Sequence, residues 1–231
     1  MIRPQHGSRA ASAAELRLSR MAALTEADLT ALRFAEANGK VVRARRDILG
    51  EGQKLNQPML IVSGWAARVR LVADGRRQFV DFLLPGDLIG CWGQQGPLMV
   101  STVLALTDVI VAPAPSSDAS AGFREAYAMS RAVAEAHLIA QVVRLGRLNA
   151  QERILDLFLE LHDRLRLTGL AEESSFELPL TQEMLADALG LTPVHINRTL
   201  QAMRRDNQVT WKQGRFTLRD AAALARQIGR S

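Results

Sequence analysis

The sequence has one cysteine, Cys91, and only four histidines in 231 residues. A single cysteine excludes a disulfide within the chain, and it excludes an iron–sulfur cluster or a zinc site built from several cysteines of one chain. The histidines are His6, His137, His162 and His195, so none falls in the Gly-rich segment between residues 40 and 113. We therefore expect that segment to hold no metal-binding cluster, and we predict no metal site.

Long apolar runs are also missing. No stretch approaches the roughly 18 consecutive apolar residues that a membrane-spanning helix needs. The N-terminal residues include Arg3 and Arg9 but no apolar segment of the kind found in signal peptides. With 48% apolar residues and a mean hydropathy of −0.01, the chain is expected to be a cytoplasmic globular protein without membrane contact, long enough for two modest domains.

Positive charge is concentrated near the C-terminus. Residues 181–231 have seven arginines and one lysine against four acidic residues, and their net charge of +4 is most of the +5 of the whole chain. Such an excess suits a surface that faces phosphates. A solvated basic face without function would have the same composition.

The sequence LTQEMLADALGLTPVHINRTL at residues 180–200 has the pattern of two helices joined by a tight turn. Thr181 is predicted to cap the first helix, and Gly190 stands where a residue in the left-handed region would end it. Thr192 is predicted to cap the second helix. Pro193 then occupies the first helical position, where a missing N–H costs nothing.

The second of these helices has one apolar face and one polar face. Ile196, Leu200 and Met203 recur at the spacing of a buried face. The opposite face carries Val194, Asn197, Arg198 and Gln201. A helical hairpin with a polar and basic outer face meets the requirements for reading a DNA major groove, although an ordinary helical hairpin would share the pattern.

A short β-hairpin follows the helical pair. Residues 209–211 and 215–218 are strand-like and flank a Lys-Gln-Gly turn, and Asp220 is placed to cap a terminal helix over 221–228. An amphipathic helix over 150–167 precedes the motif, and a loop at 169–177 joins the two. We therefore predict a winged helix-turn-helix domain over residues 149–231.

Between residues 40 and 113 the periodicity changes to that of short strands. The strand-like runs alternate with Gly- and Pro-containing turns, and Asp74-Gly75 is a strong hairpin signal. The runs are 41–42, 48–49, 59–62, 68–72, 78–83, 100–103 and 108–111. Many short strands at this spacing indicate an antiparallel barrel or sandwich. The predicted fold class is α+β, with an antiparallel β domain over residues 21–120.

The N-terminus is predicted to be loosely structured. Residues 1–12 are rich in Ser, Ala, Gly and Arg, and we expect a flexible N-terminal tail over residues 1–20. Apolar positions between residues 13 and 37 indicate one or two short helices, the second capped by Thr25.

A long helix without proline is predicted for residues 121–148, after a small-residue connection. Small and branched residues repeat along it at a 3-4-3-4 spacing, which is the pattern of a coiled-coil seam. The predicted dimer seam is Ala126, Met129, Val133, Ala136, Ala140 and Val143. Leu138, Val142 and Leu145 form a second apolar row that we expect to pack on the chain's own β domain. We favour a homodimer over a helix wholly buried in one chain, because small seam residues permit close helix approach.

The order of β domain, long helix and winged helix-turn-helix resembles the Crp/Fnr family of bacterial transcription regulators. The resemblance covers residues 24–228 and is most specific in SGWAARVRLVADGRRQFVDFLLPGD at 63–87 and LTQEMLADALGLTPVHINRTLQAMRRDNQV at 180–209. The first stretch resembles a cyclic-nucleotide-binding β-roll. The resemblance, rather than the strand spacing, therefore implies a jelly-roll-like β-roll as the N-terminal sensor domain.

The resemblance also implies a sequence-specific regulator that binds a near-palindromic operator as a homodimer and contacts RNA polymerase. Arg198 can donate two hydrogen bonds to guanine, Asn197 can contact a base edge, and Val194 can meet a thymine methyl group. Many family members have an acidic base-reading residue in place of Val194, so we expect a different half-site. The residues expected at phosphates, or at both phosphates and bases, are Thr181, Gln182, Thr192, His195, Gln201 and Arg215.

Family members that bind cyclic AMP have a glutamate and an arginine in the loop after a Pro-Gly-Asp turn. Here Cys91 and Met99 stand at those positions, and residues 88–101 contain no charged residue. Because a buried phosphate needs a compensating charge, cyclic AMP is not expected to bind. Haem is not expected either, although His137 could ligate iron in principle. Cys91 could be a redox switch or an inert buried thiol.

The main alternative function is a nucleotide- or small-ligand-binding regulatory module whose winged helix contacts protein rather than DNA. The two functions differ in whether the protein binds a near-palindromic duplex with a strong salt dependence. An enzyme is not expected, because the sequence shows no nucleophile, base or metal constellation. The histidine positions also argue against a cupin-type metalloenzyme.

Overall fold

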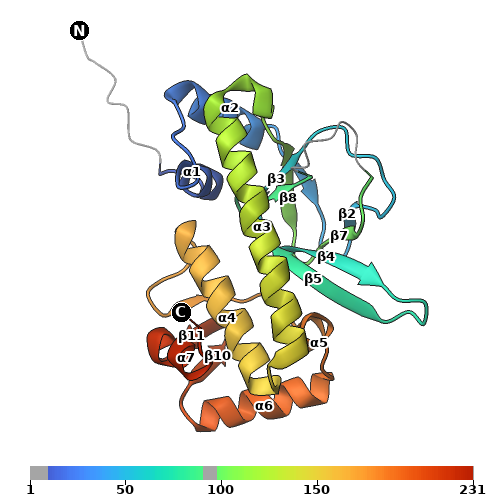
Figure 1. The fold of residues 1–231 in the computed structure, drawn as a ribbon, viewed down its shortest axis with the longest axis vertical. Coiled ribbons are helices and arrows are strands. Elements are labelled where there is room, and N and C mark those ends of the chain that lie inside the picture. Colours follow the sequence, from blue (N-terminus) through green and yellow to red (C-terminus); the bar gives the residue numbers. More distant parts are fainter. Residues whose placement is uncertain (1–9, 91–97, 231) are drawn as a thin grey trace.

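The computed structural model describes residues 10–90 and 98–230. Two N-terminal helices, α1 (Ala13–Ser19) and α2 (Glu26–Ala37), lie at one end of the molecule (Figure 1). Each begins at a capping box, in which a hydroxyl side chain at the N-cap and an acidic side chain three residues later accept hydrogen bonds from each other's backbone. The predicted cap at Thr25 is confirmed.

The expected flexible tail over residues 1–20 is wrong for α1. Ala14 and Leu18 are buried in a cluster that includes Phe123 and Tyr127 of the long helix. The apolar positions from residue 13 onward do indicate a short helix here, and a helix of seven residues is stabilised by tertiary packing rather than by its own propensity. Residues 1–9 lie outside the described residues.

The β domain consists of two four-stranded antiparallel sheets packed face to face, as the jelly-roll-like expectation requires. One sheet has the order β1 (Lys40–Val42), β8 (Val109–Pro113), β3 (Met59–Ser63) and β6 (Leu88–Ile89). The other has the order β2 (Asp47–Leu49), β7 (Thr102–Ala105), β4 (Ala66–Leu71) and β5 (Arg77–Leu83). The strand β6 was not predicted, because two residues are too few to show a strand period.

A single long helix connects the two halves of the molecule. After a short turn, η1 (Ser117–Ala119), the helix α3 (Ala121–Arg147) begins at the N-cap Ser120 and runs beside the β domain (Figure 1). The predicted long helix at 121–148 is therefore confirmed. Asn149 caps the next helix, α4 (Ala150–Leu167), which packs against α3. None of the described helices is both long enough and apolar enough to cross a membrane.

The C-terminal region is a winged helix-turn-helix, as predicted. Its elements are β9 (Ser175–Glu177), α5 (Gln182–Leu189), α6 (Pro193–Arg205), β10 (Val209–Lys212), β11 (Arg215–Leu218) and α7 (Ala221–Gln227). The strand β9 falls in the segment expected to be a loop, and it completes a three-stranded sheet by pairing with β11. Phe158 of α4, Phe176 and Phe216 stack together in the core of this region.

The core of the DNA-binding region continues into the β domain. Trp65, Phe79 and Phe82 of the β domain belong to the same buried cluster as the apolar side chains of α4, α5 and α6. The two parts are thus packed as one body: α5 contacts β5, and α6 in turn packs against α5 and α4.

Part of the predicted dimer seam does not lie on the exposed face of α3. Ala126 is buried against the chain's own N-terminal helices, so it is not available to a partner chain. Met129, Ala136 and Val143 are exposed, whereas Val133 and Ala140 are half-buried.

The second apolar row of α3 packs on the β domain only in part: Leu138 lines a cavity beside β4 and β5, and Leu145 is half-buried. Leu138 and Val142 are exposed, and Ile139, which belongs to neither predicted row, is 59% exposed. The apolar stripe that faces solvent is therefore Met129, Ala132, Ala136, Ile139 and Val143, which keeps the 3-4-3-4 spacing but is rotated from the predicted seam.

Gly64 is predicted to be intolerant of a side chain. It has φ +82°, and a Cβ there would clash with the carbonyl oxygen of Asp108, whereas Gly75, with φ +85°, has open space around it. Gly75→Ala should lower the free energy of unfolding by about 1–2 kcal/mol, the cost of the left-handed backbone. Gly64→Ala should lower it by about 1–3 kcal/mol more, measured by urea unfolding. Equal losses for the two variants would contradict the clash.

Candidate DNA-binding surface and sensor cavity

The helix α6 presents the predicted base-reading face to solvent. Gly190 ends α5 in the left-handed region at φ +62°, and the Thr192 hydroxyl accepts a hydrogen bond from the His195 N–H at 3.2 Å to begin α6. The inner face of α6 is buried and fixes the helix in the core, through Ile196, Leu200 and Met203. On the outer face Val194 is 79% exposed, Arg198 and Gln201 are exposed, and Asn197 and His195 are half-buried.

The residues predicted at phosphates lie around this face. The Thr181 hydroxyl caps α5 by accepting from the Met184 N–H at 3.2 Å, and Gln182 is half-exposed beside it. The backbone N–H groups at these two helix starts are oriented to bind anions. Arg215, at the start of β11, is already ion-paired with Glu172 and donates to the Ser175 hydroxyl at 3.1 Å. A phosphate would therefore have to compete with Glu172 for Arg215.

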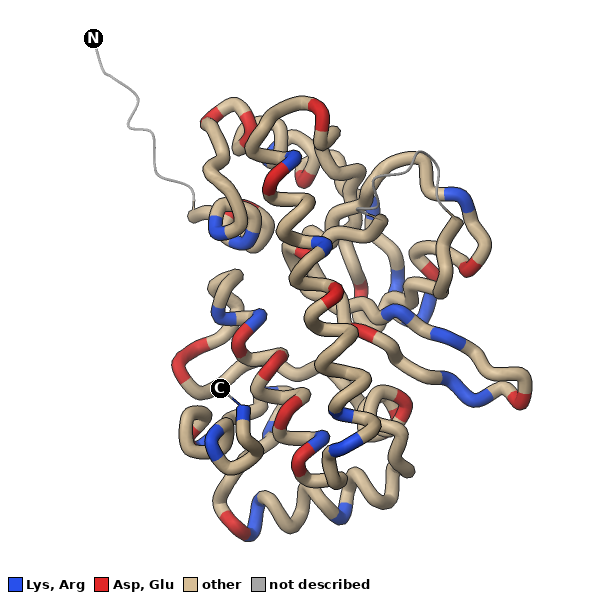
Figure 2. Tube along the Cα trace, in the orientation of Figure 1, with Lys and Arg blue, Asp and Glu red and all other residues tan. Residues whose placement is uncertain are grey.

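Basic residues gather on two elements at the surface of the molecule. Figure 2 shows Lys and Arg along α6 and along the hairpin formed by β4 and β5. On α6 these include the exposed Arg198, Arg204 and Arg205. The positive charge that the sequence places in residues 181–231 is thus partly on the recognition helix itself, where it can face phosphates.

A cavity of about 490 Å³ lies between β4, β5 and α3, and small ligands typically bind in concave sites of this size. Five arginines line it, from α1, β4, α3 and α4: Arg17, Arg68, Arg70, Arg131 and Arg164. Three carboxylates, Asp81, Asp87 and Glu135, oppose them. Its apolar lining includes Leu83, Leu88 and Leu138.

The loop after the Pro-Gly-Asp turn does not by itself determine the charge of the cavity. Residues 88–101 do lack charge, but arginines from other elements supply it, so the loop alone does not decide whether an anion can bind. Met99 is buried in the core between the two sheets, so its side chain does not face the cavity. Cys91, and with it the question of a redox switch, lies outside the described residues.

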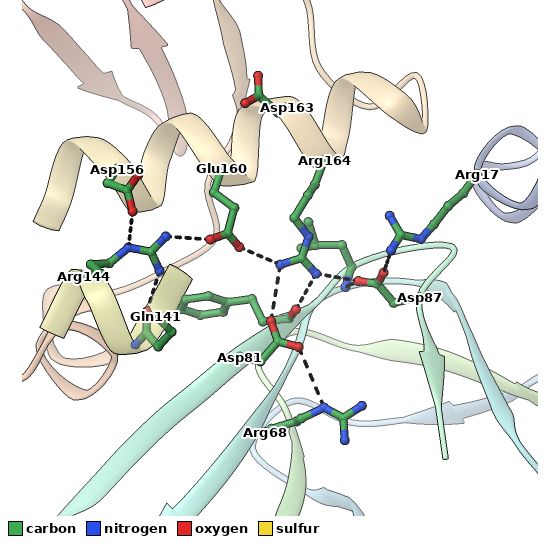
Figure 3. Close-up of polar contacts among 12 residues, drawn as sticks. Arg17, Arg68, Asp81, Asp87, Gln141, Arg144, Asp156, Glu160, Asp163 and Arg164 are labelled. Carbon is green, nitrogen blue, oxygen red and sulfur yellow. Dashed lines mark hydrogen bonds and ion pairs between the residues drawn. The ribbon is translucent and has the colours of Figure 1, made fainter. Parts of the chain in front are cut away.

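Arg164 of α4 is the centre of a group of charges on the cavity floor (Figure 3). It is 4% exposed and donates to Asp87 at 2.7 Å, to Glu160 at 3.0 Å and to the Phe82 carbonyl at 2.6 Å. Asp87 also pairs with Arg17 of α1 at 2.6 Å. One guanidinium therefore joins the N-terminal helix, the turn after β5 and the DNA-binding region.

These contacts shift the ionisation of their members in opposite directions. Burial alone would raise the pKa of Asp87 and of Glu160, but the arginine charges beside them outweigh burial, and both pKa values lie below their usual range. Burial lowers the pKa of Arg164, but the charges of Asp87, Asp81 and Glu160 raise it above its usual value. All three groups therefore stay charged at neutral pH.

Asp81 makes weaker ion pairs than Asp87 and Glu160 do. Its nearest cations are Arg164 at 3.4 Å and Arg68 at 3.8 Å, both longer than a good charge-assisted hydrogen bond. Burial consequently raises the pKa of Asp81 to about 6. Burial, together with the charge of Arg164, also lowers the pKa of the neighbouring His137 to about 4.

Asp81, His137 and Glu160 each bring one potential metal-ligand atom to within 4.8 Å of the others. The histidine positions in the sequence did not reveal this group, because its members come from β5, α3 and α4. Glu160 is already paired with Arg144 and Arg164, and a metal ion here would lie beside the Arg164 guanidinium. Because like charges this close repel strongly, the group fits a metal ion poorly, and we assign no metal to it.

Two family descriptions match the chain. Residues 40–125 match the cyclic nucleotide-binding domain, and residues 152–227 match the Crp-like helix-turn-helix domain. Together they define a class of regulators in which a sensor domain is joined to a winged helix-turn-helix.

Similar proteins come from the same class. The nitrogen fixation regulation protein FixK of Azorhizobium caulinodans is 30% identical over 189 residues, which is 78% of this chain and 75% of FixK. The transcriptional activator protein FnrL of Cereibacter sphaeroides is 28% identical over 197 residues, covering 81% of this chain and 79% of FnrL. The solved structure of FixK2 from Bradyrhizobium japonicum superposes with a TM-score of 0.69 at 26% identity, covering 82% of this chain and 96% of that one. The chain belongs to the Crp/Fnr family of transcription regulators.

The raised pKa of Asp81 predicts a pH-dependent stability difference. Between about pH 4 and pH 6 the folded protein holds a proton on Asp81 that the unfolded chain has released, so this group lowers the stability of the fold as pH rises. Asp81→Asn removes the effect. We expect the stability of the variant relative to wild type to increase by about 1–2 kcal/mol between pH 4.5 and pH 7.5. Urea unfolding at both pH values measures this, and a difference that is independent of pH would contradict it.

Proposed function

We propose that the protein is a cytoplasmic transcription regulator that binds a near-palindromic operator as a homodimer, with α6 of each subunit in a major groove. The observation that carries this proposal is the outer face of α6, where solvent-exposed polar and basic side chains are held on a helix with a fully buried inner face. A rigid helix of this kind can enter a groove without refolding. FnrL is called a transcriptional activator, which supports a role in transcription.

Base recognition depends on three residues of α6. Arg198 donates two hydrogen bonds to guanine, Asn197 contacts an adjacent base edge, and Val194 contacts a thymine methyl group. Residues at the helix starts, on α6 and at the wing contact phosphates and fix the register: Thr181, Gln182, Thr192, His195, Gln201 and Arg215. Arg215 takes part after exchanging Glu172 for a phosphate oxygen.

The exposed stripe of α3 forms the dimer interface. An apolar stripe at 3-4-3-4 spacing on a long helix is the pattern of a two-stranded coiled coil, and small residues such as Ala132 and Ala136 allow close approach. Two α3 helices related by a two-fold axis would place the two α6 helices symmetrically, matching a two-fold operator. RNA polymerase is then the expected partner of the DNA-bound dimer.

The cavity beside α3 is the place for an effector. Three carboxylates oppose its five arginines, and its wall is partly apolar. Because Cys91 and Met99 stand where members that bind cyclic AMP have a glutamate and an arginine, we propose neither cyclic AMP nor haem as a cofactor. We also propose no catalytic step. The remaining alternative is a ligand-binding module whose winged helix contacts protein.

Selection of DNA by the purified protein tests the proposed function. Randomised duplexes bound by the protein should converge on a near-palindrome, and affinity should fall steeply with salt because phosphate contacts release counterions. Failure to enrich any sequence, with no salt-dependent binding to DNA, would favour the protein-contact alternative.

Arg198→Ala is predicted to abolish selective binding. Removing a bidentate guanine contact should cost about 1–3 kcal/mol of discrimination at that position. Weak binding to random DNA and dimerisation should persist, because the Arg198 side chain is exposed on the outer face of α6. Competition of operator against random DNA measures the ratio. Equal losses for both DNAs would make Arg198 a phosphate contact instead.

Ile139→Asp is predicted to dissociate the dimer. A carboxylate in the centre of an apolar helix pair would be buried without a partner in both subunits. Leu71→Asp is a matched control, because Leu71 is an aliphatic side chain on the β4–β5 hairpin that is about as exposed as Ile139. Sedimentation equilibrium should show a monomer for Ile139→Asp alone. Dimers of normal affinity in both variants would place the interface elsewhere.

A further inference from the structure

The end of the first helix of the helix-turn-helix is bound by side chains of the rest of the chain. The Ala188 carbonyl of α5 accepts hydrogen bonds from Gln141 of α3 at 2.6 Å and from Gln78 of β5 at 3.1 Å. The next carbonyl, of Leu189, accepts from Arg153 of α4 at 3.0 Å. These carbonyls are the free acceptors of a helix C-terminus, directly before the turn at Gly190. The turn that sets the angle between α5 and α6 is therefore fixed from outside the motif.

Gln141 is the last member of a continuous set of contacts that begins on α1. The Gln141 amide oxygen accepts from Arg144 at 2.5 Å, and Arg144 donates to Glu160 at 2.6 Å. Glu160 accepts from Arg164, which reaches Asp87 and, through it, Arg17. We call this set the buried polar network: Arg17, Asp87, Arg164, Glu160, Arg144 and Gln141 (Figure 3).

One end of the network lies at the cavity, and the other lies at the helix-turn-helix. Arg17, Asp87 and Arg164 line the cavity. At the other end, Gln141 holds the helix-turn-helix. All six side chains belong to residues that are 8% exposed or less, so water does not compete for their contacts. In such surroundings the loss of one partner leaves another polar group unsatisfied.

We propose that the buried polar network is a positioning device that fixes the recognition helix relative to α3 and links the cavity floor to the turn of the helix-turn-helix. This inference rests on the proposed function. Because α3 carries the dimer axis, the angle between α3 and α6 sets the distance between the two recognition helices. The network thus determines which half-site spacing the dimer can bind, while the base contacts of each half-site are unaffected.

Gln141→Glu tests the positioning role with a side chain of the same shape. It keeps the acceptor for Arg144 but removes the donor to Ala188. We expect the affinity of the variant for the selected palindrome to fall about tenfold. The loss of affinity caused by moving the half-sites by one base pair should be smaller in the variant than in wild type. Affinity for a single half-site duplex should not change, and Gln227→Glu, on the exposed end of α7, should behave as wild type. An equal loss on half-site and palindrome would indicate general destabilisation and overturn the proposal.

A double-mutant cycle tests whether the network is continuous. Arg17→Met removes its far end, and the losses of palindrome affinity in Arg17→Met and Gln141→Glu should not multiply in the double variant. Independent sites combine to within about twofold, so a larger deviation is expected here. Losses that multiply within that margin would mean that the two ends are not coupled.

Amide hydrogen exchange in DNA-free protein separates this inference from the proposed function. Arg17→Met should speed exchange in α5 and α6, whereas Arg43→Met, at an exposed pair with Asp108, should not. Unchanged exchange in α5 and α6 of Arg17→Met would overturn the network whether or not the protein binds DNA. Failure of the wild type to select a duplex would overturn only the proposed function.

Discussion

The ion pairs of Arg164 connect the β domain to the helix that leads into the winged helix-turn-helix. A buried guanidinium is stable only if carboxylates and carbonyls replace the water that it has lost, and here Asp87, Glu160 and the Phe82 carbonyl do so. Asp87 belongs to the β domain and Glu160 to the helix that leads into the DNA-binding region. Removing one partner of such a group typically costs about 3–5 kcal/mol. The relative placement of the two regions is therefore specified by charge as well as by the shared apolar core.

The same contacts connect the cavity to the DNA-binding region. The cavity floor consists of Arg164 and its partners rather than of inert apolar side chains. Asp81 is the weakest member of this group, since its cations lie at 3.4 and 3.8 Å. A ligand or a proton that changes the charge near Asp81 acts on groups that α4 needs for its position. In a packed interior such local changes are transmitted because the structure cannot deform continuously.

Several elements could be predicted because their signals are local. Thr192, Pro193 and Gly190 specify where the helices of the DNA-binding motif begin and end through backbone chemistry alone. Asp74-Gly75 similarly specifies a hairpin. The strands β6 and β9 were missed, because each is stabilised by partners distant in sequence. The rotation of the exposed stripe on α3 was missed for the same reason: the side that the N-terminal helices and β5 cover is fixed only in the folded chain.

The sequence by itself determined the class of fold, the winged helix-turn-helix and the outer face of α6, because helical periodicity places Val194, Asn197 and Arg198 on one side whatever the rest of the chain does. Only the tertiary structure decided the character of the sensor domain. Arg164 and Glu160 are four residues apart on α4, a spacing that exposed surface pairs share, so the sequence could not show that they are buried. Their burial depends on Asp87, Arg144 and Arg17, which come from three other segments. It decides how the cavity is charged and how the helix-turn-helix is positioned.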